Sequence, residues 1–239
     1  MTREASARVF ADGQALAEGA ADWLVGVLAA VPERAAVALS GGSTPRRLYE
    51  LLAEPARRDR IPWDRVHWFW GDERFVPPDD PASNFGMARN AFLSRVPAPE
   101  ANIHPIPTTG LSPDESAARY ARTLQAFYGS DELDPDRPLF DVNFLGLGED
   151  GHTASLIPGS ETLGERTRWV VPVCGLRPET RITLTYPALD SARHVVFLVE
   201  GARKRDAFGR VRAGDDLPAA RIRPVGQLHW FVDRAAAGD

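Results

Sequence analysis

A histidine and an aspartate stand two residues apart in the glycine-rich segment Gly146-Leu-Gly-Glu-Asp-Gly-His-Thr-Ala-Ser-Leu-Ile-Pro158. The apolar residues 142–147 predict a buried strand that leads into a loop. In this loop Asp150 is near enough to orient the ring of His152 and to stabilise its protonated form, as a general base requires. The alternative is a histidine hydrogen-bonded within a turn. We expect His152 to be a catalytic base and Asp150 to be its partner.

The same segment also contains the spacing Gly-x-Gly-x-x-Gly, at residues 146–151, which is found in dinucleotide-binding loops. Glu149 and Asp150 would then stand where a doubly charged pyrophosphate has to lie, and Pro158 leaves room for only a short helix. We therefore exclude dinucleotide binding, and we expect no cofactor.

A second polar loop, Ser40-Gly-Gly-Ser-Thr-Pro45, follows the apolar run Ala35–Leu39 and precedes a predicted helix at residues 46–53. The free N–H groups and the positive dipole end of a helix N-terminus favour an anion. The alternative is a tight turn with Thr44 as the helix N-cap. The loop lacks the Gly-Lys-Ser/Thr of a Walker A motif and the Gly-x-Ser-x-Gly of a nucleophile elbow. We expect phosphate binding by Gly41, Gly42, Ser43 and Thr44.

Two further loops carry cations after apolar strands, at Gly71-Asp-Glu-Arg74 and at Gly201–Lys204. Arg74 can bind a phosphate through its bidentate fork, or it can form a salt bridge to its acidic neighbours. Lys204 is either a phosphate ligand or an ordinary surface lysine. Asp72 either binds sugar hydroxyls or pairs with Arg74. We include Asp72, Arg74 and Lys204 in the expected substrate site.

Strands alternate with helices along the chain, which predicts an α/β fold with one mostly parallel sheet covered by helices on both faces. No repeat or domain boundary is visible, so we expect a single domain over residues 1–239. The carboxyl ends of parallel strands share one edge of a sheet, where ligands bind, so the four polar loops are expected to converge there. The expected strands are Arg8–Ala11, Ala35–Leu39, Val66–Trp70, 142–147, Trp169–Val173, Arg181–Thr185, His194–Val199 and Leu228–Val232. The expected helices are Asp12–Ala30, 46–53, 84–95, Ser112–Tyr128 and 201–208.

Composition limits the compartment and the partners. The net charge of −5 gives no reason to expect nucleic acid, and Cys174, the single cysteine, excludes an intrachain disulfide. The polar N-terminus and the absence of a long apolar run argue against a signal segment and a membrane span. We expect a cytoplasmic monomer that acts on a small molecule.

The other histidines, His67, His104, His194 and His229, lie in predicted strands or proline-rich chain, and none shows a metal-ligand spacing. We expect these four to be structural, and we expect no metal site. The aromatic run Trp68-Phe69-Trp70 is expected to belong to the core.

These motifs together resemble the 6-phosphogluconolactonases. The resemblance rests on Ser40–Pro45, on Gly71-Asp-Glu-Arg-Phe-Val-Pro77 with Ser83-Asn84, on the segment 146–158, and on Gly201-x-x-Lys204. It implies a Rossmann-like α/β fold and cofactor-free hydrolysis of 6-phospho-D-glucono-1,5-lactone, a sugar phosphate lactone, in the pentose phosphate pathway. It also implies that His152 is the general base and that the loop 40–44, Arg74 and Lys204 hold the phosphate.

The related glucosamine-6-phosphate deaminases share the Asp-Glu pair and the Asp-Gly-His, and they are the main alternative. They continue past the histidine into Asn-Glu-Pro, which supplies another catalytic carboxylate, whereas Ser155-Leu-Ile157 precedes Pro158 here. A tyrosine follows their Asp-Glu, whereas this chain has Arg74. The sequence therefore favours the lactonase. A second alternative is a sugar-phosphate sensor, although no spare DNA-binding segment is visible.

Overall fold

The computed structural model describes residues 6–238 of the 239-residue chain. Most of the polar N-terminal segment that argued against a signal peptide, and both ends of the expected 1–239 domain, lie outside the described residues. In the described part no helix is both long enough and apolar enough to cross a bilayer.

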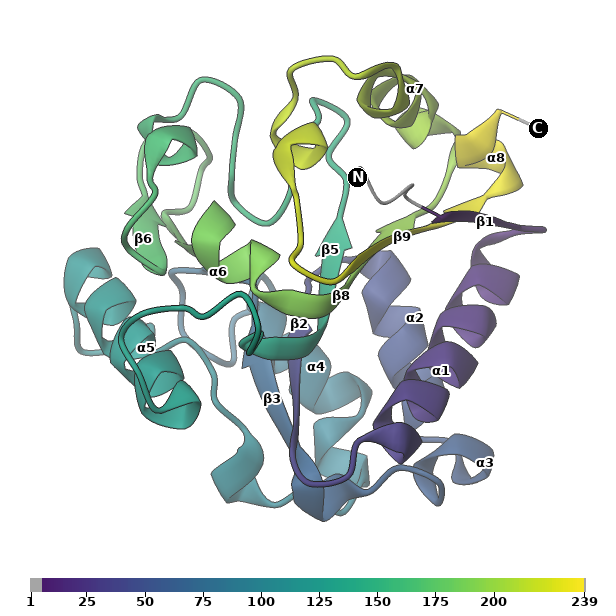
Figure 1. The fold of residues 1–239 in the computed structure, drawn as a ribbon, viewed down its shortest axis with the longest axis horizontal. Helices are drawn as coiled ribbons and strands as arrows, with labels where there is room; N and C mark the ends of the chain where they lie inside the picture. Colours follow the sequence, from purple (N-terminus) through teal and green to yellow (C-terminus); the bar gives the residue numbers. More distant parts are fainter. Residues whose placement is uncertain (1–5, 239) are drawn as a thin grey trace.

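The structure contains helices and strands in regular alternation (Figure 1). The strands are β1 (Ser6–Phe10), β2 (Ala35–Leu39), β3 (Val66–Trp70), β4 (Asp72–Arg74), β5 (Phe140–Gly146), β6 (Val170–Val173), β7 (Arg181–Leu184), β8 (Ala192–Val199) and β9 (Gln227–Asp233). The helices are α1 (Gly13–Ala30), α2 (Ser43–Leu52), α3 (Pro55–Arg58), α4 (Asn84–Ala91), α5 (Pro113–Tyr128), α6 (Tyr186–Asp190), α7 (Arg205–Ala213) and α8 (Arg234–Ala237).

Six strands form one parallel sheet in the order β1-β9-β8-β5-β2-β3. Its central strands are apolar and buried, as expected for a parallel sheet covered on both faces. The chain order reverses between β2 and β5, because β3 lies on one side of this pair and β8, β9 and β1 lie on the other. This is the topological switch point, where a crevice opens beyond the strand ends.

Helices lie on both sides of this sheet, which confirms the expected α/β architecture. Helices α1, α2 and α4 form a layer on one side, and α5 and α6 lie on the other (Figure 1). The predicted helix starts at Asp12 and Ser112 are confirmed: Asp12 Oδ1 accepts the Ala15 N–H at 2.8 Å, and Ser112 and Glu115 form a capping box. The tryptophans and phenylalanine of β3 are buried in the core, as predicted.

The prediction of a single sheet is wrong for three segments. Strands β4, β7 and β6 form a separate three-stranded antiparallel sheet, and the Asp72–Arg74 loop is itself the edge strand β4. The link between β6 and β7 covers only residues 174–180, whereas a parallel pairing needs a crossover of about a dozen residues or more. This second sheet brings its own side chains to the crevice.

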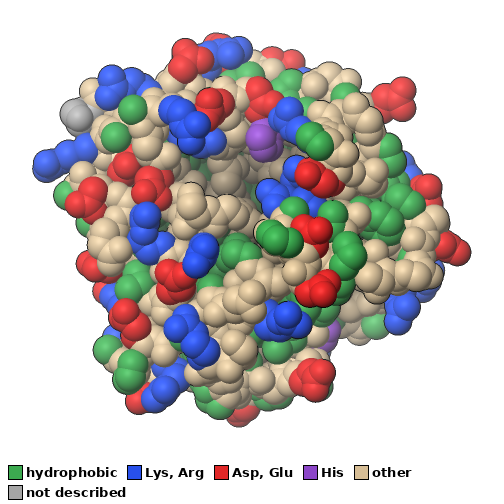
Figure 2. Space-filling view, turned by 180° about the vertical axis from the view of Figure 1, so that it is seen from behind, with side chains coloured by type: hydrophobic (Ala, Val, Ile, Leu, Met, Phe, Trp, Pro, Cys, Tyr) green, Lys and Arg blue, Asp and Glu red, His purple; other side chains and the backbone are tan. Residues whose placement is uncertain are grey.

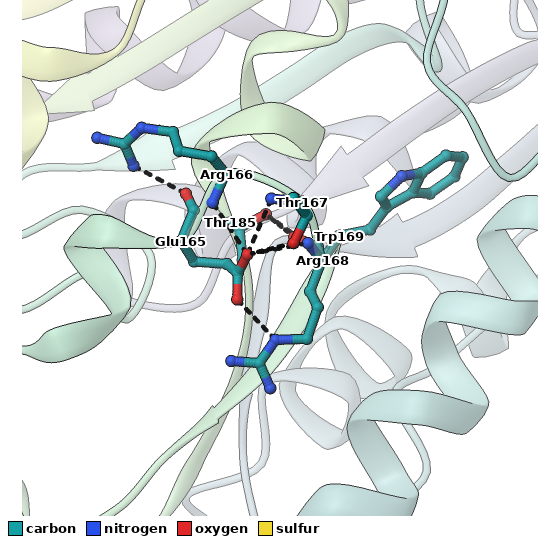
Figure 3. A network of polar contacts seen from close by, with 6 residues as sticks. All are labelled: Glu165, Arg166, Thr167, Arg168, Trp169 and Thr185. Carbon is teal, nitrogen blue, oxygen red and sulfur yellow. Dashed lines mark hydrogen bonds and ion pairs between the residues drawn. The ribbon is translucent and has the colours of Figure 1, made fainter.

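A turn around Glu165 fixes the start of this small sheet (Figure 3). Its carboxylate accepts backbone N–H groups from Thr167 and Arg168 and pairs with the Arg168 guanidinium at 2.6 Å. These contacts, first among them the Thr167 N–H, hold the pKa of Glu165 well below its usual range. Thr185, just after β7, donates its hydroxyl to the carbonyls of Arg168 and Trp169. The turn thereby ties the entry of β6 to the exit of β7.

Candidate active site

The crevice at the switch point contains a cavity of about 290 Å³, and it brings together residues from both sheets. The space-filling view shows a hollow with Lys and Arg side chains and a histidine at its rim (Figure 2). The cavity is lined by Ser40, Gly41, Gly42, Asp72, Arg74, Asn84, Gly146, Leu147, Gly148, His152, Ala154, Arg181 and Lys204. The predicted convergence of four loops at one edge is therefore confirmed.

His152 lies beside two charged partners in the loop after β5. Its Nδ1 is 2.5 Å from Asp150 Oδ1, and Asp150 Oδ2 is 2.5 Å from Arg177 Nη2. Because the carboxylate accepts the Nδ1 proton, the hydrogen-bond network assigns the neutral tautomer in which Nε2 is the proton acceptor. Partial burial raises the pKa of Asp150, but hydrogen bonds from Arg177 and His152 outweigh it and hold that pKa well below its usual range. Asp150 is therefore a carboxylate at neutral pH.

Two glycines give the loop its shape. A Cβ on Gly148 would lie 2.0 Å from His152 Nδ1, so only glycine leaves room for the histidine–aspartate contact. Gly151 has a φ of 83°, in the left-handed region that favours glycine. The Gly148 N–H donates to the His152 carbonyl at 2.8 Å and closes the turn. A turn thus follows β5, and no helix of the dinucleotide-binding type is present at residues 147–160.

Arg74 and Arg181 face each other across the pair β4–β7. Arg74 donates to the Ala82 carbonyl at 2.6 Å, and Arg181 pairs with Glu179 at 3.3 Å. The Nε atoms of both arginines are buried with no hydrogen-bond partner among residues 6–238. Burial, and after it the neighbouring charge of Arg74, lower the pKa of Arg181. Two like charges held this close, with Lys204 on the same cavity, favour an anion between them.

The loop after β2 presents backbone rather than side chains. Helix α2 begins at Ser43 with Gly42 as its N-cap, so the alternative in which Thr44 is the N-cap is wrong. Gly41 and Gly42 line the cavity, whereas Ser43 and Thr44 are not among the lining residues. The Thr44 hydroxyl donates to Glu200 at 2.7 Å. An anion in the cavity would therefore meet the backbone N–H groups at the start of α2 and not the hydroxyls of Ser43 and Thr44.

Asp72 is buried at the floor of the cavity, with only 6% of its surface exposed. Ser155 donates its hydroxyl to Asp72 Oδ2 at 2.7 Å, and the Asn84 amide donates to the Asp72 carbonyl at 2.9 Å. No ion pair joins Asp72 to Arg74 within residues 6–238. The sequence left two roles open for Asp72, binding of sugar hydroxyls or pairing with Arg74. The described contacts do not include the pairing.

The carboxylate of the neighbouring Glu73 contacts the start of α4. Its carboxylate accepts the N–H groups of Asn84 and Phe85 and the hydroxyl of Ser83, which fixes the start of α4. Burial raises the pKa of Glu73 in spite of these hydrogen bonds. Glu73 therefore holds the start of α4 in place, whereas Asp72 lines the cavity.

Among the lining and supporting residues that the sequence did not place in the site, Asn84, Arg177 and Arg181 have polar side chains that can act there. Arg181 opens a predicted strand, but nothing in the sequence indicates that this strand pairs with residues 72–74. Arg177 lies in the link between two predicted strands, where an arginine directly before Pro178 was the one available signal. Arg181 comes to the site only because β7 pairs with β4, and Arg177 only because it contacts Asp150.

The remaining histidines form two pairs away from the cavity. His67 Nδ1 is 3.0 Å from His104 Nε2, and His194 Nδ1 is 3.2 Å from His229 Nε2. Aromatic rings pack against both pairs. All four rings thus make contacts within the fold, as expected of structural histidines. Within residues 6–238 no group of three or more His, Cys, Asp or Glu side chains has an arrangement suited to a metal ion.

Fold and site together define a Rossmann-like α/β protein whose switch-point crevice combines a histidine–carboxylate pair with a cluster of three cationic side chains, those of Arg74, Arg181 and Lys204. A family model described as glucosamine-6-phosphate isomerases/6-phosphogluconolactonase matches residues 11–230. The chain belongs to this family.

Similar proteins of known name include 6-phosphogluconolactonases at higher identity and a deaminase at low identity. The 6-phosphogluconolactonase of Nostoc sp. is 47% identical over 210 residues, which cover 86% of this chain and 85% of that protein. The crystal structure of the 6-phosphogluconolactonase from Thermotoga maritima is similar with a TM-score of 0.83 at 29% identity, covering 96% of this chain and 100% of that one. A monomeric glucosamine-6-phosphate deaminase has a TM-score of 0.81 at 19% identity, covering 98% and 99%, and shares the fold alone.

Proposed function

We propose that this protein hydrolyses 6-phospho-D-glucono-1,5-lactone to 6-phosphogluconate, with His152 as the general base. The observation that carries the proposal is the position of His152 on a cavity whose lining also includes Arg74, Arg181 and Lys204. The three cationic side chains suit a phosphate, and His152 suits the activation of a water molecule next to a carbonyl. The relatives named 6-phosphogluconolactonase support the same reaction.

In the proposed mechanism the phosphate binds to the arginines, Lys204 and the N–H groups at the start of α2. Lactone C1 then lies near His152. Neutral His152 takes a proton on Nε2 from a water molecule, whose oxygen forms a bond to C1 while the carbonyl becomes an oxyanion. The C1–ring oxygen bond breaks as the oxyanion collapses, and the imidazolium returns its proton to the departing ring oxygen. Asp150 holds the ring and stabilises the imidazolium.

Deamination of glucosamine 6-phosphate is less well supported by the residues. Ser155 is bonded to Asp72, and Leu156 and Ile157 are buried, so the segment before Pro158 offers no carboxylate for a second acid. Lactone hydrolysis needs only a base and a polarised carbonyl.

A paired assay tests the proposal: acid release from freshly generated 6-phosphogluconolactone is measured beside ammonia release from glucosamine 6-phosphate. We expect acid release above the spontaneous rate and no ammonia. Ammonia release would identify a deaminase, and activity on neither substrate would favour a sugar-phosphate sensor.

We also propose that the chain acts as a single-domain monomer in the cytoplasm. One hydrophobic cluster joins the two sheets, and Cys174 is free and exposed, which suits a reducing compartment. The net charge of −5 gives no support for a nucleic-acid partner. Light scattering coupled to gel filtration would give the mass, expected near 26.2 kDa.

A further inference from the structure

Glu200, the residue between β8 and the Lys204 turn, forms a partly buried junction with the start of α2. Its Oε2 accepts the Thr44 hydroxyl at 2.7 Å, and its Oε1 accepts Arg47 Nη1 at 2.9 Å. Both partners belong to the first turns of α2. A Cβ on Gly13, the first residue of α1, would lie 1.9 Å from Glu200 Oε1, so that helix start also packs directly on the carboxylate.

This junction joins two elements that the proposed function uses. The residues before Thr44 supply the N–H groups that face the anion, and the residues after Glu200 supply Lys204. The Lys204 turn is fixed on its other side, because the Gly201 N–H donates to Asp233 at 3.0 Å and its carbonyl accepts the Lys204 N–H at 2.9 Å. Through its contacts with Thr44 and Arg47, Glu200 connects this turn to α2.

The charge of Glu200 argues against direct binding of substrate. A carboxylate next to a phosphate site repels the anion, and here Arg47 offsets that charge. Both carboxylate oxygens are already engaged by protein donors. Its contribution is therefore geometric.

We infer that Glu200 is a positioning residue that holds the start of α2 and the Lys204 turn in the spacing required by a phosphate. This inference rests on the proposed function. It also reassigns Thr44: its hydroxyl serves the Glu200 contact and does not bind substrate.

The test compares Glu200→Ala with Glu200→Gln. Glutamine keeps an oxygen for the Thr44 hydroxyl but removes the charge, whereas alanine removes both. We expect KM for 6-phosphogluconolactone to be about three- to tenfold higher in E200A than in E200Q, the value of one hydrogen bond, with kcat within about twofold. Equal KM values would overturn the inference, because charge alone would then explain any effect.

Thr44→Val completes a double-mutant cycle. In the wild-type and E200Q backgrounds it should raise KM by the same factor, and in E200A it should have no further effect. A further rise of KM in E200A would show that Thr44 contacts substrate independently, which would contradict the inference. Glu50→Ala, which removes the exposed Arg46–Glu50 pair on α2, is the matched control and should leave KM unchanged.

Binding of 6-phosphogluconate, measured by calorimetry with the same variants, separates the two proposals. A wild-type protein that fails to hydrolyse the lactone overturns the proposed function. The ratios of Kd among the variants still test the positioning role of Glu200. A common Kd for E200A, E200Q and T44V would overturn the positioning role. Circular dichroism of each variant checks that the fold is retained.

Discussion

His152 Nδ1 lies 2.5 Å from Asp150 Oδ1, and this contact fixes which ring nitrogen accepts a proton. The aspartate is in turn held by Arg177, which belongs to the link between β6 and β7. The His152 ring is thus oriented by residues that belong to both sheets: Asp150 follows a strand of the parallel sheet, and Arg177 links two strands of the antiparallel sheet. An orienting carboxylate keeps the imidazole in one tautomer and stabilises its protonated form during the reaction.

Replacing His152 by alanine should lower kcat for the lactone by about 10²–10⁴, the usual contribution of a general base. KM should change little, because the phosphate ligands remain. Initial rates measured against the spontaneous hydrolysis of the lactone provide the check. A variant with close to wild-type kcat would remove His152 from its assigned role.

Arg177→Ala should shift the acid limb of the kcat/KM profile to higher pH. The acid limb reports uptake of a proton by the base of the free enzyme, and the Arg177 guanidinium, 3.3 Å from His152 Nδ1, is a positive charge whose removal favours that proton. Arg177→Lys, which keeps a positive charge at this position, should move the acid limb part of the way back to its wild-type pH. An acid limb that does not move in the alanine variant would mean that Arg177 is merely structural.

Arg74→Ala and Arg181→Ala should each raise KM for the phosphorylated lactone about tenfold or more, since each removes a charge-assisted hydrogen bond to phosphate. Their effect on unphosphorylated gluconolactone should be much smaller. Steady-state kinetics with both lactones measure the difference. Equal losses on the two substrates would place these arginines outside the phosphate site.

Ala154→Gly should raise the free energy of unfolding by up to about 1 kcal/mol, because Ala154 has a φ of 47° in a region that favours glycine. Ala118→Gly, on the exposed face of α5, is the control, and it should lower stability by about 0.5–1 kcal/mol. Urea denaturation of the two variants would reveal opposite signs. Loss of stability in Ala154→Gly would contradict the strain argument.

Acid should destabilise the protein between about pH 6.5 and pH 4. Burial lowers the pKa of His104 and of His229 to about 4, so in this range the unfolded chain binds more protons than the folded one. The stability contributed by these neutral histidines is present above pH 6.5 and is lost as pH falls towards 4. Asp190 opposes the trend, because burial raises its pKa to about 7 and the folded chain takes up its proton first.

Melting temperatures measured across this range test the balance. His104→Phe, which preserves stacking on Phe69, should flatten the acid loss, and Asp190→Asn should steepen it. A wild-type melting temperature that rises as pH falls would show that Asp190 outweighs the histidines.

Local signals in the sequence determined much of the fold. β2 and β3 have the predicted bounds, and α5 has the predicted capping box, because hydrophobic periodicity and helix caps act over a few residues. The closeness of Asp150 to His152 was also predictable, since the two residues belong to one glycine-rich turn.

Only the tertiary structure decided which distant residues complete the site. Arg181 reaches the cavity because β7 pairs with β4, and Arg177 reaches Asp150 because the β6–β7 link folds over the loop after β5. Thr44 is turned to Glu200 by the contact between α2 and the end of β8. Such pairings depend on packing between segments that are 27 residues apart for Arg177 and Asp150 and 156 residues apart for Thr44 and Glu200, and a single sequence carries no local pattern for them.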